Sequence, residues 1–144
     1  MTDRKLLRKG VFVAISSLFF YVALPYIIYT KYLVQFPQLA LENYINWIMR
    51  MGIIIAGVQF FKSVSSEKTT RQALGDLLLS IVYLIFFFKL FTLEVVVDVT
   101  ENVTVFISME GFIYLYLLAA LIGIFANVIR VFEVWNSARR IRSL

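Results

Sequence analysis

Residues 112–132 read FIYLYLLAALIGIFANVIRVF, a run of twenty-one residues in which Arg130 carries the only charge. An α-helix needs about 20 consecutive, predominantly apolar residues to cross the hydrocarbon core of a bilayer. The run meets this requirement in length and in composition. It therefore predicts a transmembrane helix.

Three further apolar runs predict spans at about residues 11–29, 44–61 and 73–91. A signal peptide is the alternative for the first run, since both begin with basic residues. A signal peptide has an apolar region of about 7–15 residues and an A-x-A-like cleavage site. The run at 11–29 is longer and lacks that site, so we predict a retained span. The fold class is an all-α membrane protein, packed as a four-helix bundle in one domain, 1–144.

The composition supports a membrane protein and excludes several kinds of chemistry. Hydrophobic residues make up 61% of the chain and charged residues 16%, whereas soluble domains carry about 25% charged residues. The chain has no His and no Cys, which excludes His-ligated haem, iron–sulfur clusters, thiolate or imidazole metal sites and His-containing catalytic triads. We therefore expect no catalytic residues, no cofactor and no metal.

The basic residues predict the orientation of the chain. Of the fourteen, four precede residue 10, three lie within 62–72 and three lie in the tail, whereas segment 92–110 has none. Cytoplasmic loops carry the excess of Lys and Arg, so we expect both termini in the cytoplasm, in the plasma membrane. These charges border apolar runs, so their predicted partners are anionic lipid headgroups on the cytoplasmic side and not nucleic acid.

The segment between the third and fourth spans, about 92–110, has the pattern of a β-hairpin. LEVVVDVT and VTVFIS are rich in β-branched residues, and Glu101 and Asn102 lie between them. Asn tolerates the backbone conformations that tight turns need. We predict a hairpin on the outer side of the membrane. Asn102 also begins an N-glycosylation tripeptide.

Arg50 is the most unusual charge in the predicted spans. It lies twelve residues from Lys62, or roughly 18 Å at 1.5 Å per residue, which is past the midplane of the membrane. With Asn46 one turn away, it could line a pore, form a structural pair or extend to outer phosphates. Lys89, near the outer end of the third span, can reach the headgroups.

A second polar group is predicted near the cytoplasmic ends of the spans. Asp76 lies five residues beyond Arg71, about 7 Å inside the boundary. Gln59, Asn127 and Arg130 fall at a similar depth. We expect these four residues to form one cluster in which Asp76 and Arg130 pair, either as a structural clamp or as a site that handles protons or cations.

Small residues and the tail complete the predicted sites. Gly52 with Ala56, and Ala119 with Gly123, form small-xxx-small pairs that suit close helix packing in lipid. The tail, 133–144, has apolar residues at helical spacing and basic residues towards the other side. It predicts an amphipathic helix on the inner leaflet, whose headgroup contacts are Trp135, Arg139, Arg140 and Arg142.

Two functions are consistent with these patterns. The first is a non-enzymatic membrane subunit that assembles through its helices and outer hairpin, with copies of itself or with larger membrane proteins. The alternative is a homo-oligomeric ion channel or transporter with Arg50 and Asp76 at the pathway. The apolar segment 52–58 between Arg50 and Gln59 interrupts any polar stripe on the second span, which favours assembly.

Overall fold

The computed structural model of the chain describes residues 3–32, 34, 41–67, 69–92, 95–100, 103–107 and 110–142. Within these residues, four helices are long and apolar enough to cross a membrane: Arg4–Lys31, Glu42–Val64, Thr70–Phe91 and Gly111–Arg139. They include the four predicted spans. Each is longer than predicted because polar residues at its ends continue the helix.

The first span contains a π turn. It consists of α1 (Asp3–Leu18), the π-helix η1 (Phe19–Ala23) and α2 (Leu24–Lys31). Pro25 has no backbone N–H, and its ring crowds the carbonyl one turn before it. The chain widens directly before this proline, and the backbone N–H of Leu24 donates to the carbonyl of Phe19. The disturbance at Pro25 is therefore absorbed without ending the helix.

The other spans are α3 (Glu42–Val64), α4 (Thr70–Phe91) and α5 (Glu110–Arg142). Thr69 caps α4, because its Oγ1 accepts a hydrogen bond from the backbone N–H of Gln72 at 3.3 Å. The 33 residues of α5 extend about 50 Å. The predicted tail helix is the last part of α5, because no Gly or Pro follows Gly123.

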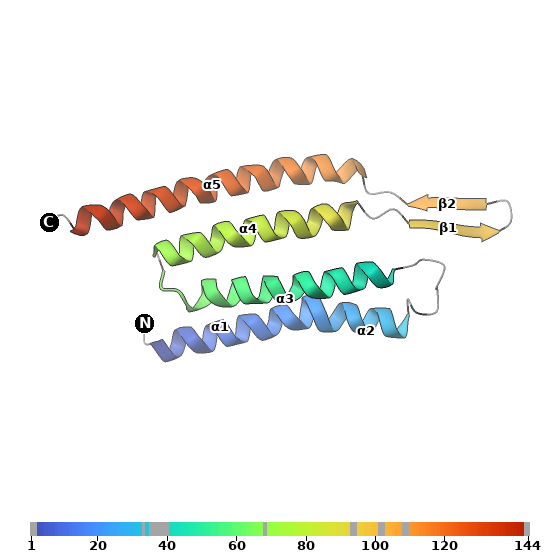
Figure 1. The fold of residues 1–144 in the computed structure, drawn as a ribbon, viewed down its shortest axis with the longest axis horizontal. Helices are drawn as coiled ribbons and strands as arrows, with labels where there is room; N and C mark the ends of the chain where they lie inside the picture. Colours follow the sequence, from blue (N-terminus) through green and yellow to red (C-terminus); the bar gives the residue numbers. More distant parts are fainter. Residues whose placement is uncertain are drawn as a thin grey trace.

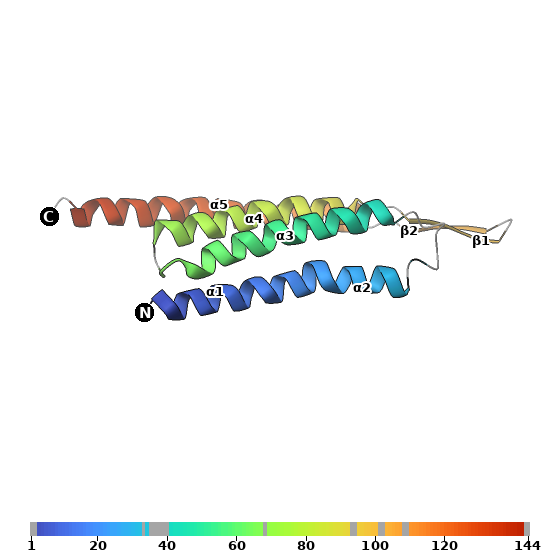
Figure 2. The same ribbon diagram turned by 60° about the horizontal axis from the view of Figure 1, so that its bottom comes forward.

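The four spans form an open row in the order α1, α3, α4, α5 (Figure 1). The turned view separates α1 from α5 at opposite sides of the row (Figure 2). This arrangement corrects the expectation of a four-helix bundle. In lipid, no hydrophobic force drives apolar helices together, so packing follows small residues and polar contacts.

The row has two distinct ends (Figure 1). Both chain ends and the α3–α4 connection lie at one end, which we call the terminal end. The other end, the hairpin end, carries β1 (Val95–Thr100) and β2 (Val103–Ile107). The strands are antiparallel, with Val97 opposite Val105. Glu101 and Asn102, the predicted turn and glycosylation site, lie outside the described residues.

The tightest packing in the row joins α3 to the first span. A Cβ atom at Gly52 would lie 2.7 Å from the carbonyl oxygen of Tyr21, so only glycine permits this approach. Ala56, one turn on, is buried, and Ile55 beside it has no exposed surface. The first predicted small-residue pair therefore packs inside the chain.

The second predicted pair is uncovered. Ala119 is exposed, and a Cβ atom at Gly123 would meet no atom within 4 Å. Many large side chains on the same helix are exposed as well, including Phe125. The face of α5 away from α4 is thus apolar and open among the described residues.

Candidate functional site

Polar residues follow one face of α4. Asp76, Ser80 and Tyr83 recur at intervals of four and three residues, which places them on one side of a helix. Side chains from α3 and α5 reach this side. We call these three residues and their polar partners the polar stripe, and it is the candidate site of the protein.

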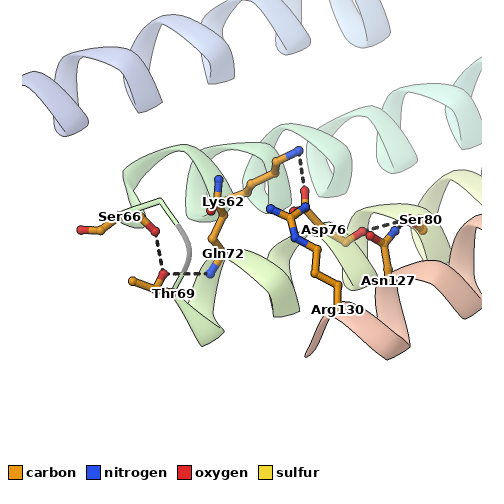
Figure 3. Close-up of polar contacts among 8 residues, drawn as sticks. All are labelled: Lys62, Ser66, Thr69, Gln72, Asp76, Ser80, Asn127 and Arg130. Atoms are coloured by element: carbon orange, nitrogen blue, oxygen red, sulfur yellow. Dashed lines mark hydrogen bonds and ion pairs between the residues drawn. The ribbon is translucent and has the colours of Figure 1, made fainter. Parts of the chain in front are cut away.

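The first level of the polar stripe is an ion-pair triad (Figure 3). Lys62 Nζ on α3 lies 2.6 Å from Asp76 Oδ1, and Arg130 Nη1 on α5 lies 2.8 Å from Asp76 Oδ2. The Asp76 side chain is only 11% exposed, whereas those of Lys62 and Arg130 are 36% and 47% exposed. The predicted pairing of Asp76 with Arg130 is confirmed, and Lys62 is an additional partner.

Gly75 explains how Lys62 reaches the carboxylate. A Cβ atom at Gly75 would lie 3.0 Å from Lys62 Cβ and 3.2 Å from Lys62 Cα. The missing side chain lets the backbones of α3 and α4 approach one another at this level. The lysine stem then lies beside Asp76, the next residue of α4.

This arrangement limits what the carboxylate of Asp76 can do. Each of its two oxygens has a cationic partner, and the triad carries a net positive charge. A carboxylate that accepts charge-assisted hydrogen bonds on both oxygens has little capacity left for a further cation. The geometry therefore favours a clamp joining α3, α4 and α5 over a cation-binding site.

Ser80 and Asn127 form the next contact along the stripe (Figure 3). Asn127 Nδ2 donates to Ser80 Oγ at 2.7 Å, and Ser80 Oγ donates to the carbonyl of Asp76 at 3.0 Å. The predicted residue Asn127 thus lies next to the triad, as expected, but bonds to a serine and not to the acid. It provides a second polar link between α4 and α5.

Gln59 belongs to a separate network around Tyr83. Gln59 Nε2 donates to Tyr83 Oη at 2.6 Å, and Ser17 Oγ hydrogen-bonds to Gln59 Oε1. The hydroxyls of Tyr21 and Tyr83 are 3.3 Å apart. The prediction that Gln59 joins Asp76 is wrong. Since α3 and α4 are antiparallel and Lys62 already faces Asp76, a residue earlier on α3 faces a residue later on α4.

Aromatic rings enclose this network. Trp47 and Tyr21 pack on Phe86, with ring centroids 5.6 Å and 5.7 Å away. From α5, Tyr116 Oη donates to the backbone carbonyl of Tyr83 at 2.8 Å. The level of Tyr83 therefore draws polar groups from all four spans.

The network residues Ser17, Tyr21 and Tyr83 were not predicted from the sequence. A hydroxyl in an apolar run is compatible with lipid and gives no signal of its own. The spacing of Asp76, Ser80 and Tyr83 is a usable signal. It places Ser80 and Tyr83 on the same helical face as Asp76, which the sequence already predicts as a site residue.

Arg50 and Asn46 lie away from the polar stripe. Both are exposed, and neither has a hydrogen bond or ion pair among the residues that the structure describes. Gln59 and Arg50 are nine residues apart, which is about 180° around a helix. The outer face of α3, with Asn46, Arg50 and Gly57, therefore points away from Asp76 and Tyr83.

The remaining predicted lipid contacts are partly described. Arg139 Cζ lies 4.3 Å from the centre of the Trp135 ring, a cation–π contact near the end of α5. The side chains of Arg140 and Arg142 lie outside the described part of the chain. Lys89 Nζ lies 5.4 Å from the centre of the Tyr44 ring, so a partner in α3 holds this cation.

Replacing Tyr83 with phenylalanine will destabilise the fold by about 1 kcal/mol, because Gln59 loses its acceptor inside the span. The free energy of unfolding, measured by denaturant titration in mixed micelles, checks this. Tyr114→Phe is the matched control, since Tyr114 is 77% exposed on α5. A loss no larger than that of the control would show that the network does not stabilise the protein.

Comparison with protein-family models, with the sequences of characterised proteins and with solved structures found no match.

Proposed function

We propose that this protein is a non-enzymatic integral membrane subunit that acts by assembling with other membrane chains through the uncovered faces of α3 and α5. In this proposal the spans lie in the plasma membrane and the terminal end is cytoplasmic. The observation that carries the proposal is Arg50, a charge in the middle of an apolar helix that is exposed and has no described partner within the chain.

An exposed arginine in a span is costly when it faces lipid. Insertion scales assign about 2.5–3.5 kcal/mol to Arg at the centre of a helix. Arg50 lies roughly 18 Å along α3 from Lys62, the residue whose pair with Asp76 is near the terminal end. A carboxylate or carbonyl group of a neighbouring chain would remove this cost.

The surroundings of Arg50 suit contact with another helix. Asn46 lies one turn before it, and Gly57 lies two turns after it on the same face of α3. A Cβ atom at Gly57 would meet nothing within 4 Å. A small residue beside polar ones permits close approach and interhelical hydrogen bonds in lipid.

The open row supplies a second contact face. α5 packs along α4, and the small residues Ala119 and Gly123 lie on its uncovered part. In the proposal, Arg50 gives the polar specificity, and the face of α5 gives close packing. The hairpin adds unpaired strand edges at the hairpin end, which can pair with another chain.

The charge distribution supports the orientation. The helix ends that meet at the terminal end (Figure 1) carry basic residues: Arg4 and Arg8 near the start of α1, Lys62 near the end of α3 and Arg71 near the start of α4. An excess of Lys and Arg favours the cytoplasmic side. The hairpin would then stand on the outer surface.

The pathway alternative has less support from the geometry. Asp76 is occupied by two cations, and Arg50 is on the opposite side of α3 from the polar stripe. A pathway that uses both residues would have to pass on both sides of the same helix.

The test of the proposal is Arg50→Leu. Loss of a charge-assisted hydrogen bond to a partner weakens association by about 1.5–3 kcal/mol, or about tenfold to 150-fold. Native mass spectrometry of the protein released from nanodiscs will show the complex in the wild type and a smaller species in the variant. Lys89→Leu is the matched control, because Tyr44 already contacts that cation.

Two results would contradict the proposal. A wild-type monomer would exclude stable assembly. An intact Arg50→Gln complex with altered ion flux in liposomes would instead support the pathway alternative.

A further inference from the structure

A hollow with both polar and apolar walls lies at the terminal end of the row. Its volume is about 530 Å³, and it lies between α1, the end of α3 and the start of α4. Leu6, Phe61 and Val64 form its apolar wall, whereas Ser66, Thr70 and Arg71 belong to its polar wall. The connection between α3 and α4 thus borders a space that has a polar side and an apolar side.

Internal hydrogen bonds fix the polar wall. Ser65 Oγ donates to the carbonyl of Phe61 at 2.9 Å, and Thr69 Oγ1 donates to the carbonyl of Ser66 at 2.7 Å. Figure 3 shows Thr69 joined to both Ser66 and Gln72. These bonds hold Ser65 and Thr69 in place without a ligand, which lowers the entropic cost of binding at these residues.

Arg71 supplies the charge of the hollow. Its side chain is exposed and forms no hydrogen bond or ion pair with another described residue. Ser66 and Thr70 add two hydroxyls whose side chains have no described partner. Glu67 lies in the same connection but is not part of the wall. A guanidinium with nearby hydroxyls is suited to phosphate oxygens.

The apolar wall continues into a second hollow of about 310 Å³. The two hollows share Leu6 and Val64, and the second adds Leu7 and Arg4. Leu6 itself is buried, so most of the open apolar surface comes from Phe61 and Val64. This apolar surface offers no hydrogen bond or charge to an inorganic ion. It can pack against the first carbons of an acyl chain.

We infer that this hollow binds one anionic phospholipid, with the headgroup phosphate on Arg71 and the hydroxyls of Ser66 and Thr70, and with the acyl chain against Leu6, Phe61 and Val64. The site is separate from the basic tail of α5. It does not depend on the assembly proposed above, since every group belongs to one chain.

Native mass spectrometry of the full chain in detergent, titrated with phosphatidylglycerol, tests this inference. The wild type will retain one tightly bound lipid. Arg71→Gln will weaken retention tenfold or more, by loss of a charge-assisted contact. Arg8→Gln, an equal loss of charge on an exposed residue outside the hollow, will weaken it less than about fivefold.

Further arms distinguish the possible ligands. Thr70→Val keeps the charge and will weaken retention about threefold to tenfold, which gives a second test if Arg71→Gln folds poorly. Phosphatidylcholine will be retained more weakly than phosphatidylglycerol.

Three results would overturn the inference. Equal losses for Arg71→Gln and Arg8→Gln would indicate diffuse attraction. Equal retention of phosphatidylcholine would show that headgroup charge is not recognised. Displacement of the lipid by millimolar inorganic phosphate would assign the hollow to free phosphate.

Discussion

Gly52→Val will lose about 3 kcal/mol or more of folding free energy, and the variant will be largely unfolded in mild denaturant. A Cβ atom at this position would lie 2.7 Å from the carbonyl oxygen of Tyr21 and 2.9 Å from the carbonyl carbon. Both atoms are backbone, so no side-chain rotation can relieve the contact. Overpacking usually costs about 1–3 kcal/mol, and a β-branched residue against backbone falls at the upper end.

The same helix offers the control for this prediction. Gly57→Val adds the same atoms where a Cβ would meet nothing within 4 Å, and both glycines lie in the interior of α3. Unfolding is followed by denaturant titration in mixed micelles, under conditions where the protein is monomeric. If both variants lose the same stability, helix propensity or insertion explains the effect, and the contact with Tyr21 does not.

Asp76→Asn will lose about 2–3 kcal/mol, because Lys62 and Arg130 would both remain without a counter-charge inside the row. Removing one partner of a buried pair costs about 3–5 kcal/mol. We lower the expected value because the side chains of Lys62 and Arg130 are 36% and 47% exposed. The measurement is again the free energy of unfolding, with Glu133→Gln on α5 as an exposed acid for comparison.

Replacing the whole triad separates a clamp from an ionic function. Lys62→Met, Asp76→Leu and Arg130→Met together leave no unpaired charge, and such replacements are often neutral or stabilising. We expect this triple variant to recover most of the stability that Asp76→Asn loses, with its assembly unchanged. A stable triple variant that has lost the assembly or the ion flux of the wild type would argue against the clamp.

The sequence predicted the features that follow from composition and depth. Apolar runs long enough to cross a bilayer, with few charged residues in them, located the four helices. The pairing of Asp76 with Arg130 followed from counting residues inward from the cytoplasmic boundary. That boundary is common to all spans, so residues at an equal distance from it lie at the same level of the membrane. Both arguments use the membrane as a common reference.

The features that it did not predict depend on which helices are neighbours. Gly52 and Gly123 have the same spacing to a second small residue, yet only Gly52 is packed inside the chain. Lys62 was counted only as one of the basic residues of 62–72, because nothing in the sequence shows that Gly75 brings it to Asp76. One sequence gives the depth of a residue but not the direction in which it faces.

The π turn at residues 19–23 changes how the first span should be counted. Leu6, Gly10 and Ser17 are buried at helical spacing, and continuing that count places Leu24 and Ile28 on the inner face. Both are exposed, at 37% and 41%, whereas Pro25 and Tyr29, one position later, are less exposed. The wide turn inserts one residue into the repeat. A helical wheel of this span is therefore valid only when drawn in two halves, separated at the π turn.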